Sequence, residues 1–175
     1  MMNTLTDNHA TGFSITTNGR LVQPVFFDFE EDFVENGIRC IPMIVRFKLD
    51  ACGIKLKLSE WAKFTESEKA LLAAMDCITK GDVLIYRNLL QRMVLVRTGS
   101  RATDLPVEPA PAWSDPYHMP FVLKEKLDQF SWTISPRQWK GLTDLQRFVL
   151  LKLCRPGHEN VNFPLAVKEF GLLKQ

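Results

Sequence analysis

The chain has 175 residues, a hydrophobic content of 46% and a formal net charge of +2 at pH 7. This nearly even charge balance gives no general reason to expect nucleic acid or a membrane surface as a partner. No run of about 20 apolar residues predicts a transmembrane helix, and the first residues lack the pattern of a secretory signal. The four cysteines are scattered, so we expect a cytoplasmic protein with reduced thiols.

The chain begins with a polar stretch, residues 1–23, which predicts a mobile tail. An acidic and aromatic lead-in segment follows at residues 24–35, where phenylalanines alternate with carboxylates. Four phenylalanines are too costly to leave in water, so at least two should pack on the body of the protein. They are Phe26, Phe27, Phe29 and Phe33.

A basic group follows the lead-in segment directly. Two interpretations of it stay open: it binds an acidic partner or a phosphate-bearing cofactor, or it pairs internally with the carboxylates of the lead-in segment, Glu30 among them. The basic residues are Arg39, Arg46, Lys48, Lys55 and Lys57.

Residues 41–76 recur without a gap as residues 119–154, at an offset of 78 positions. Self-similarity at one offset is typical of a duplicated structural unit. Each copy contains a helix with a proline at its first position, a tryptophan that we interpret as a core anchor, and a threonine that opens a capping box. These residues, to which we assign structural roles, are Pro42, Trp61 and Thr65 in the first copy and Pro120, Trp139 and Thr143 in the second. Lys48 and Asp50 also recur, either as ion pairs to the other copy or on a solvated helix face.

A third helix is predicted after each matched block. Asp82 is the expected N-cap of the first, which stops near Gly99, and Asn162 is the expected N-cap of a shorter second one. Four prolines between the copies predict a crossing linker with little regular structure. The predicted fold is therefore all-α: two tandem copies of a three-helix unit packed about a pseudo-twofold axis into one helical domain. Its segments are residues 24–97, the linker 98–118, and residues 119–175.

The sequence contains no pattern typical of an active site or a metal site. There is no GxSxG, no glycine-rich phosphate loop and no pair of carboxylates with an evident function, and the nearest cysteines are twelve positions apart. We therefore predict no enzyme, no cofactor and no metal. A helix–turn–helix interpretation of residues 61–75 is weakened because its second helix lacks the usual base-reading side chains.

Four motifs then carry a family resemblance. They are FDFE at residues 27–30, RCIPM at 39–43, RFKLDACGIKL at 46–56, and Trp61 followed by TESE at 65–68. With these motifs the chain resembles the nitrate reductase-associated protein family, small bacterial proteins of cyanobacterial type, over roughly residues 24–154. The resemblance implies an accessory protein that helps an assimilatory, molybdenum-dependent nitrate reductase become active. It implies no catalytic residue.

The leading hypothesis is therefore a non-catalytic maturation factor that binds nitrate reductase. Aromatic and arginine side chains often dominate interfaces, so its predicted partner-binding residues are Phe26, Phe27, Phe29, Glu30, Arg39, Arg46, Lys55 and Lys57. The alternative is a small-ligand module for a phosphate-bearing, molybdopterin-type cofactor, held between the copies by Arg39, Arg46 and a tryptophan. A DNA-binding regulator is the weaker third hypothesis.

Overall fold

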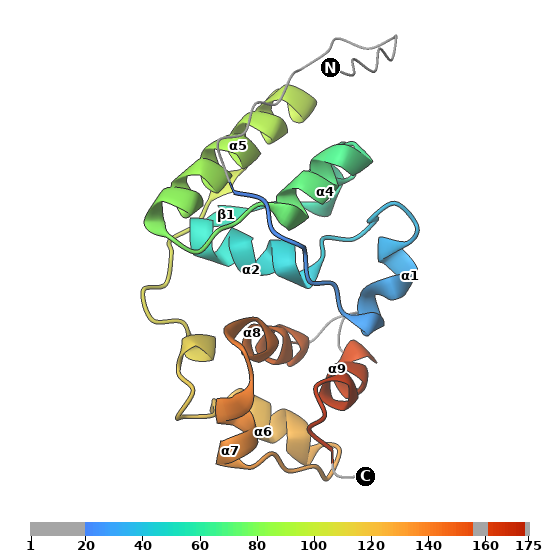
Figure 1. Ribbon diagram of the computed structural model, residues 1–175, viewed down its shortest axis with the longest axis vertical. Coiled ribbons are helices and arrows are strands. Elements are labelled where there is room, and N and C mark those ends of the chain that lie inside the picture. The colour runs from blue at the N-terminus through green and yellow to red at the C-terminus, as the bar shows by residue number, and fades with distance from the viewer. Residues whose placement is uncertain (1–19, 156–160, 174–175) are drawn as a thin grey trace, which may run out of the picture.

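The computed structural model describes residues 20–155 and 161–173, and most of these residues lie in helices (Figure 1). The prediction of a largely helical protein is confirmed. The first group of elements is α2 (Met43–Cys52), β1 (Ile54–Lys55), α3 (Leu58–Trp61), α4 (Glu66–Ala74) and α5 (Lys80–Thr98). The second group is α6 (Phe121–Asp128), α7 (Pro136–Gly141), α8 (Asp144–Leu153) and α9 (Phe163–Glu169).

Helix starts recur at the 78-residue offset of the sequence repeat. The helices α2, α3 and α4 begin at residues 43, 58 and 66, and α6, α7 and α8 begin at residues 121, 136 and 144. Pro42 and Pro120 are the N-caps of α2 and α6, with nearly equal backbone angles. The prediction that places the proline at the first helical position is therefore wrong by one residue. Thr65 and Thr143 each accept a hydrogen bond from the N3 amide and complete a capping box. That these matches come from two copies of a three-helix unit stays a prediction.

Trp61 and Trp139 are buried in matched surroundings. The Trp61 indole donates a hydrogen bond to the Ile38 carbonyl (2.8 Å), and the Trp139 indole donates one to the Asp115 carbonyl (3.0 Å). A cation lies over each ring, Lys69 in the first case and Arg147 in the second. Each tryptophan thus ties the segment before a proline-started helix to the core.

The third helices differ between the two groups. Helix α5 has 19 residues and packs on α2, whereas α9 has seven and packs on α8. The predicted N-cap of α5 is wrong by three positions. Thr79 is the N-cap, and Asp82 is its partner in the capping box. Asn162 is the N-cap of α9, but its side chain makes no capping hydrogen bond.

The expected pseudo-twofold packing is wrong. Helix α8 lies against α2, and a twofold axis would therefore also place α4 against α6. Figure 1 shows α4 and α6 far apart, with α2 and α8 between them. The two groups are joined instead through α2, α8 and the lead-in segment.

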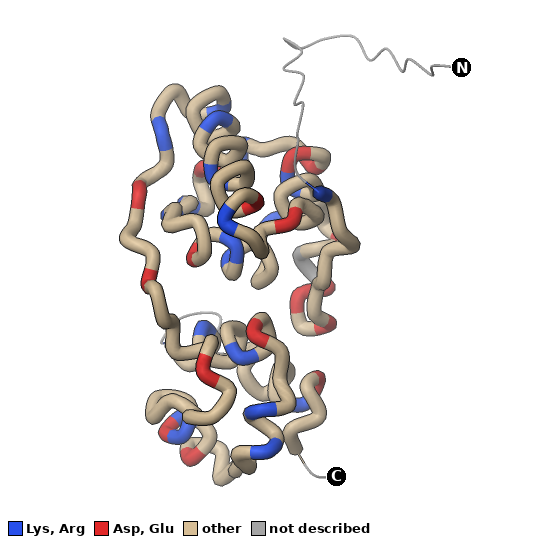
Figure 2. Tube along the Cα trace, turned by 60° about the vertical axis from the view of Figure 1, so that its left-hand side comes forward, with Lys and Arg blue, Asp and Glu red and all other residues tan. Residues whose placement is uncertain are grey.

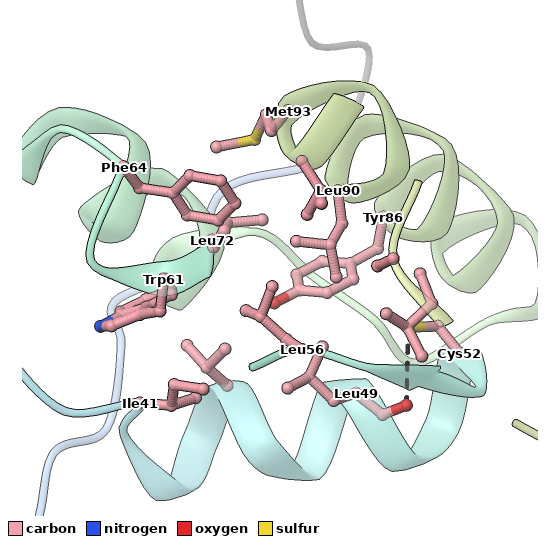
Figure 3. Packing of buried hydrophobic residues seen from close by; sticks show 14 of the residues in the cluster. Ile41, Leu49, Cys52, Leu56, Trp61, Phe64, Leu72, Tyr86, Leu90 and Met93 are labelled. Atoms are coloured by element: carbon pink, nitrogen blue, oxygen red, sulfur yellow. Dashed lines mark hydrogen bonds between the residues drawn. The ribbon is translucent and has the colours of Figure 1, made fainter. Parts of the chain in front are cut away.

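Helix α2 contributes to two hydrophobic cores. Val45, Leu49 and Cys52 face the first core, where Tyr86 reaches from α5 toward α2 (Figure 3). Met43 and Phe47 face the second core, and the Phe47 ring meets that of Phe148 edge-on at 5.3 Å. The two groups therefore form one helical domain.

The linker is more ordered than its prolines predict. Its strand β2 (Thr103–Asp104) pairs antiparallel with β1, and the 3-10 helix η2 (Ala112–Ser114) packs on α8. The connection needs Gly53, whose φ of 64° is left-handed, because a Cβ there would lie 2.5 Å from the Leu105 carbonyl oxygen. Figure 2 shows the linker running along one side of the molecule between the two groups.

Only residues 20–23 of the predicted tail belong to the described part of the chain. Residues 20–22 do not form a free end, because Leu21 bridges Met75 and the Val22 amide donates to the Ala74 carbonyl (2.7 Å). Residues 1–19 lie outside the described part of the chain, as do the side chains of Asp32 and Phe33 and the whole of His158.

Candidate functional site between the two helical groups

The lead-in segment forms the joint between the two groups. It contains the 3-10 helix η1 (Asp28–Glu30) and α1 (Glu31–Val34). Phe27 is only 6% exposed; its ring stacks on Phe29 at 5.3 Å and meets Phe170 at an angle. Phe26 packs on the first core and Phe29 on the second. Phe26, Phe27 and Phe29 thus dock, which satisfies the prediction that at least two would, and Phe27 offers almost no surface to a partner.

Glu30 has an internal partner. It is 1% exposed and accepts hydrogen bonds from the amides of Met43 (2.8 Å) and Phe27 (3.3 Å). Burial raises the pKa of this carboxyl from 4.5 to about 7, against the opposing effect of the two amides and Arg46. Glu30 therefore caps the beginning of α2 and does not lie on the predicted partner-binding surface.

Glu169 at the end of α9 holds the other side of the lead-in segment. Its carboxylate accepts from the amides of Asp28 (3.1 Å) and Phe29 (3.4 Å). Two carboxylates, Glu30 and Glu169, thus fix this segment to the first amide of α2 and to the last turn of α9. The role of Glu169 could not be predicted from the sequence, because nothing near residue 169 points to residue 28.

The predicted basic group does not gather at one place. Arg39, Lys55 and Lys57 are exposed, while Arg46 is half-buried and donates from Nε to the Ile41 carbonyl (2.9 Å). Arg39 precedes α2 and Lys55 follows it, and a ten-residue helix is about 15 Å long. The structure therefore brings the aromatic part of the predicted surface together and separates its basic part.

The recurring Lys48 and Asp50 have different roles. Lys48 is buried, and its ammonium donates to the carbonyls of Ala73 (2.6 Å) and Leu72 (3.4 Å) near the end of α4. Burial lowers the pKa of Lys48 from 10.5 to about 8. Asp50 pairs with Lys152 of α8 at 2.9 Å, so one of the two expected contacts does cross to the other group.

A cleft of about 830 Å³ lies beside this ion pair. One wall is the last half of α2, with Leu49 and Asp50, and the opposite wall is a face of α8, with Phe148 and Lys152. Residues 105–114 of the linker, including Trp113, form the third wall. This volume lies within the usual range for small-ligand pockets.

The cleft differs from the pocket that the ligand hypothesis required. It lies between the two groups and has a tryptophan in its wall, as expected, but Arg39 and Arg46 do not line it. Its cations are Lys80, Lys152 and Arg155. The helical spacing of Phe148, Lys152 and Arg155 was the available signal, yet a helix face does not reveal what it faces.

Three of the four cysteine thiols are poor nucleophiles. Burial raises the pKa of Cys52 to about 11 and those of Cys77 and Cys154 to about 12, so these thiols are protonated at neutral pH. No group of three or more histidine, cysteine or acidic residues in the described ranges is placed to hold a metal ion. Within the same ranges, none of the helices has the length and apolar character needed to cross a bilayer.

Comparison with known proteins supplies the last observation. A family model described as conserved nitrate reductase-associated protein matches residues 26–170, from the lead-in segment to the residue after α9. Comparison with curated proteins finds no significant match, and comparison with solved structures finds none either.

Proposed function

The chain belongs to the nitrate reductase-associated protein family, and we propose that it is a non-catalytic accessory factor that binds a molybdenum-dependent nitrate reductase and assists its activation. The family match carries this proposal, because it spans both helical groups and the joint between them. Protonated thiols argue against cysteine-based catalysis, and an even charge balance argues against binding of nucleic acid. Both favour binding to a protein partner. We place the encounter in the cytoplasm, where four free cysteines stay reduced.

The partner surface that we propose consists of the accessible members of the predicted set. Arg39, Lys55 and Lys57 are exposed, and Phe26, Phe29 and Arg46 are partly exposed. Phe27 and Glu30 support this surface from inside. Replacing Phe27 by serine therefore does not separate binding from folding, because removing a buried phenylalanine ring costs about 3–5 kcal/mol.

The test is co-elution of the tagged protein with nitrate reductase from the same cell, with and without molybdenum starvation. A maturation factor is expected to co-elute most strongly with the cofactor-free reductase that starvation produces. Absence of co-elution in both states contradicts the proposal.

Charge reversal then locates the surface. Arg39→Glu and Lys57→Glu are expected to weaken reductase binding about tenfold or more, because rim charges steer and orient an encounter. Lys63→Glu, the same change at another exposed lysine of the first group, is the matched control. Equal binding by all three variants would place the interface elsewhere, and circular dichroism checks that each variant is folded.

A further inference from the structure

We propose that the cleft between α2 and α8 binds a flat aromatic ring system that carries an acidic group, either phosphate or carboxylate. The proposal rests on the shape of the walls and on the charges within reach. It does not depend on reductase binding, because none of the proposed partner-surface residues lines the cleft.

The wall that would receive the ring is fixed before binding. Trp113 packs at 4.8 Å from the Phe47 ring and at 6.3 Å from the Phe148 ring. Its carbonyl accepts a hydrogen bond from Arg147 Nε (2.7 Å), and Arg147 is itself buried. Three prolines of the linker line the same side and have little backbone freedom to lose. A rigid aromatic and aliphatic wall favours a flat apolar ring, since little conformational entropy is lost on binding.

The charges at the cleft favour an acidic group on that ring. Lys80 and Arg155 are exposed at its edge, and neither forms an ion pair within the described ranges. Two carboxylates besides Asp50 line the cleft: Glu108 on the linker is exposed and has no ion pair in the same ranges, whereas Asp144 of α8 is paired with Arg147. Two uncommitted cations therefore oppose one uncommitted anion.

Lys152 is the cation that we expect to change partners. Its side chain is 19% exposed, its ammonium lies 5.0 Å above the Phe148 ring, and it pairs with Asp50, whose side chain is 44% exposed. An acidic ligand in the cleft can replace Asp50 on Lys152, and Asp50 then turns to water at small cost. Asp50 is thus an internal competitor of the ligand.

A matched pair of probes tests the proposal on the full chain. Flavin mononucleotide has a flat ring and a phosphate, and riboflavin has the same ring without the phosphate. Titration followed by flavin fluorescence is expected to show binding of the mononucleotide about tenfold tighter than of riboflavin, the effect of one charge-assisted hydrogen bond. Equal affinities, or no binding of either probe, overturn the proposal.

Variants expected to lower or to raise the affinity for flavin mononucleotide locate its phosphate. Arg155→Gln and Lys152→Gln are expected to reduce the preference for the mononucleotide, and Asp50→Asn is expected to increase its affinity by releasing Lys152. Trp113→Phe should weaken both probes equally. Arg155 is exposed, so Arg155→Gln is expected to fold. The proposal can therefore still be tested if Lys152→Gln does not fold. A preference unaffected by Arg155→Gln and Asp50→Asn would place the phosphate outside this cleft and contradict the proposal.

Discussion

Tyr86 carries a buried hydroxyl without a hydrogen-bond partner among the described residues. The residue is fully buried in the first core, and burial raises the pKa of its hydroxyl well above 10. An unsatisfied buried hydroxyl costs about 1–3 kcal/mol. We therefore expect Tyr86→Phe, which keeps the ring, to raise the free energy of unfolding by about 1 kcal/mol in urea denaturation. Tyr117→Phe, at an exposed site, is the control and should change it by less than about 0.5 kcal/mol. A less stable Tyr86→Phe variant would contradict this account.

Glu30 is expected to make stability depend on pH near neutrality. Its pKa is about 7 in the folded chain against 4.5 for the ordinary group. Between these values the folded chain holds a proton that the unfolded chain has released. The free energy of unfolding should therefore fall as pH rises from 4.5 to 7, by about 2–3 kcal/mol. Urea denaturation at pH 5 and pH 8 measures the fall, and Glu30→Gln should abolish this part of it. If the free energy of unfolding of Glu30→Gln falls between pH 5 and pH 8 as much as that of the parent chain, another group causes the fall.

Residue identity alone did not predict where these charges lie. In the sequence, Glu30 and Lys48 resemble ordinary surface residues, yet both are buried because each satisfies backbone groups at a helix end far along the chain. Of the two amides that Glu30 accepts from, that of Phe27 is three residues away but that of Met43 is 13 residues away, and the carbonyls that Lys48 binds are 24 and 25 residues away. Such partners are set by tertiary packing, which no local pattern encodes.

The first residues of α2 and α6 offer a matched comparison between elements. Met43 and Phe121 each follow the proline N-cap, but Met43 is 4% exposed and Phe121 is 72% exposed. The lead-in segment covers the first position, as the Glu30 bond to the Met43 amide shows.

The same substitution should therefore have unequal effects. We expect Met43→Ala to lower the free energy of unfolding by about 2–4 kcal/mol, because it leaves a cavity in the second core. Phe121→Ala should change it by less than about 0.5 kcal/mol. Thermal and urea denaturation of the two variants makes the comparison, and similar losses would refute the assigned difference in burial.

Elements fixed by local chemistry were predictable, and those fixed by contacts were less so. The capping boxes at Thr65 and Thr143 join groups three residues apart, so the sequence shows both partners. The start of α5 was misplaced because Thr79 and Asp82 belong to one box and either can be taken for its first member. Ser131 occupies the position that matches Gly53 and is also left-handed, with φ of 56°, but α6 already ends at Asp128, two positions before the residue that matches the end of α2.

At the scale of the whole molecule, the repeat predicted helices but not their assembly. Similar local sequences give similar local elements, whereas the packing of the two groups depends on the lead-in segment, the linker and the unequal third helices. The cleft illustrates the limit. Asp50, Trp113 and Lys152 come from three segments, and only their packing shows that they share one space.

The two sides of the joint made by the lead-in segment are synthesised at different times. The amide of Asp28 is bound by Glu169, 141 residues later in the chain. At the usual rates of synthesis, roughly 5–20 residues per second, Glu169 is synthesised about 7–30 seconds after Asp28. During this interval Phe27 has no Phe170 to meet and no second core to enter. Until α9 has been synthesised, the Phe27 ring of the growing chain therefore stays exposed, and an exposed aromatic ring is a target for chaperones.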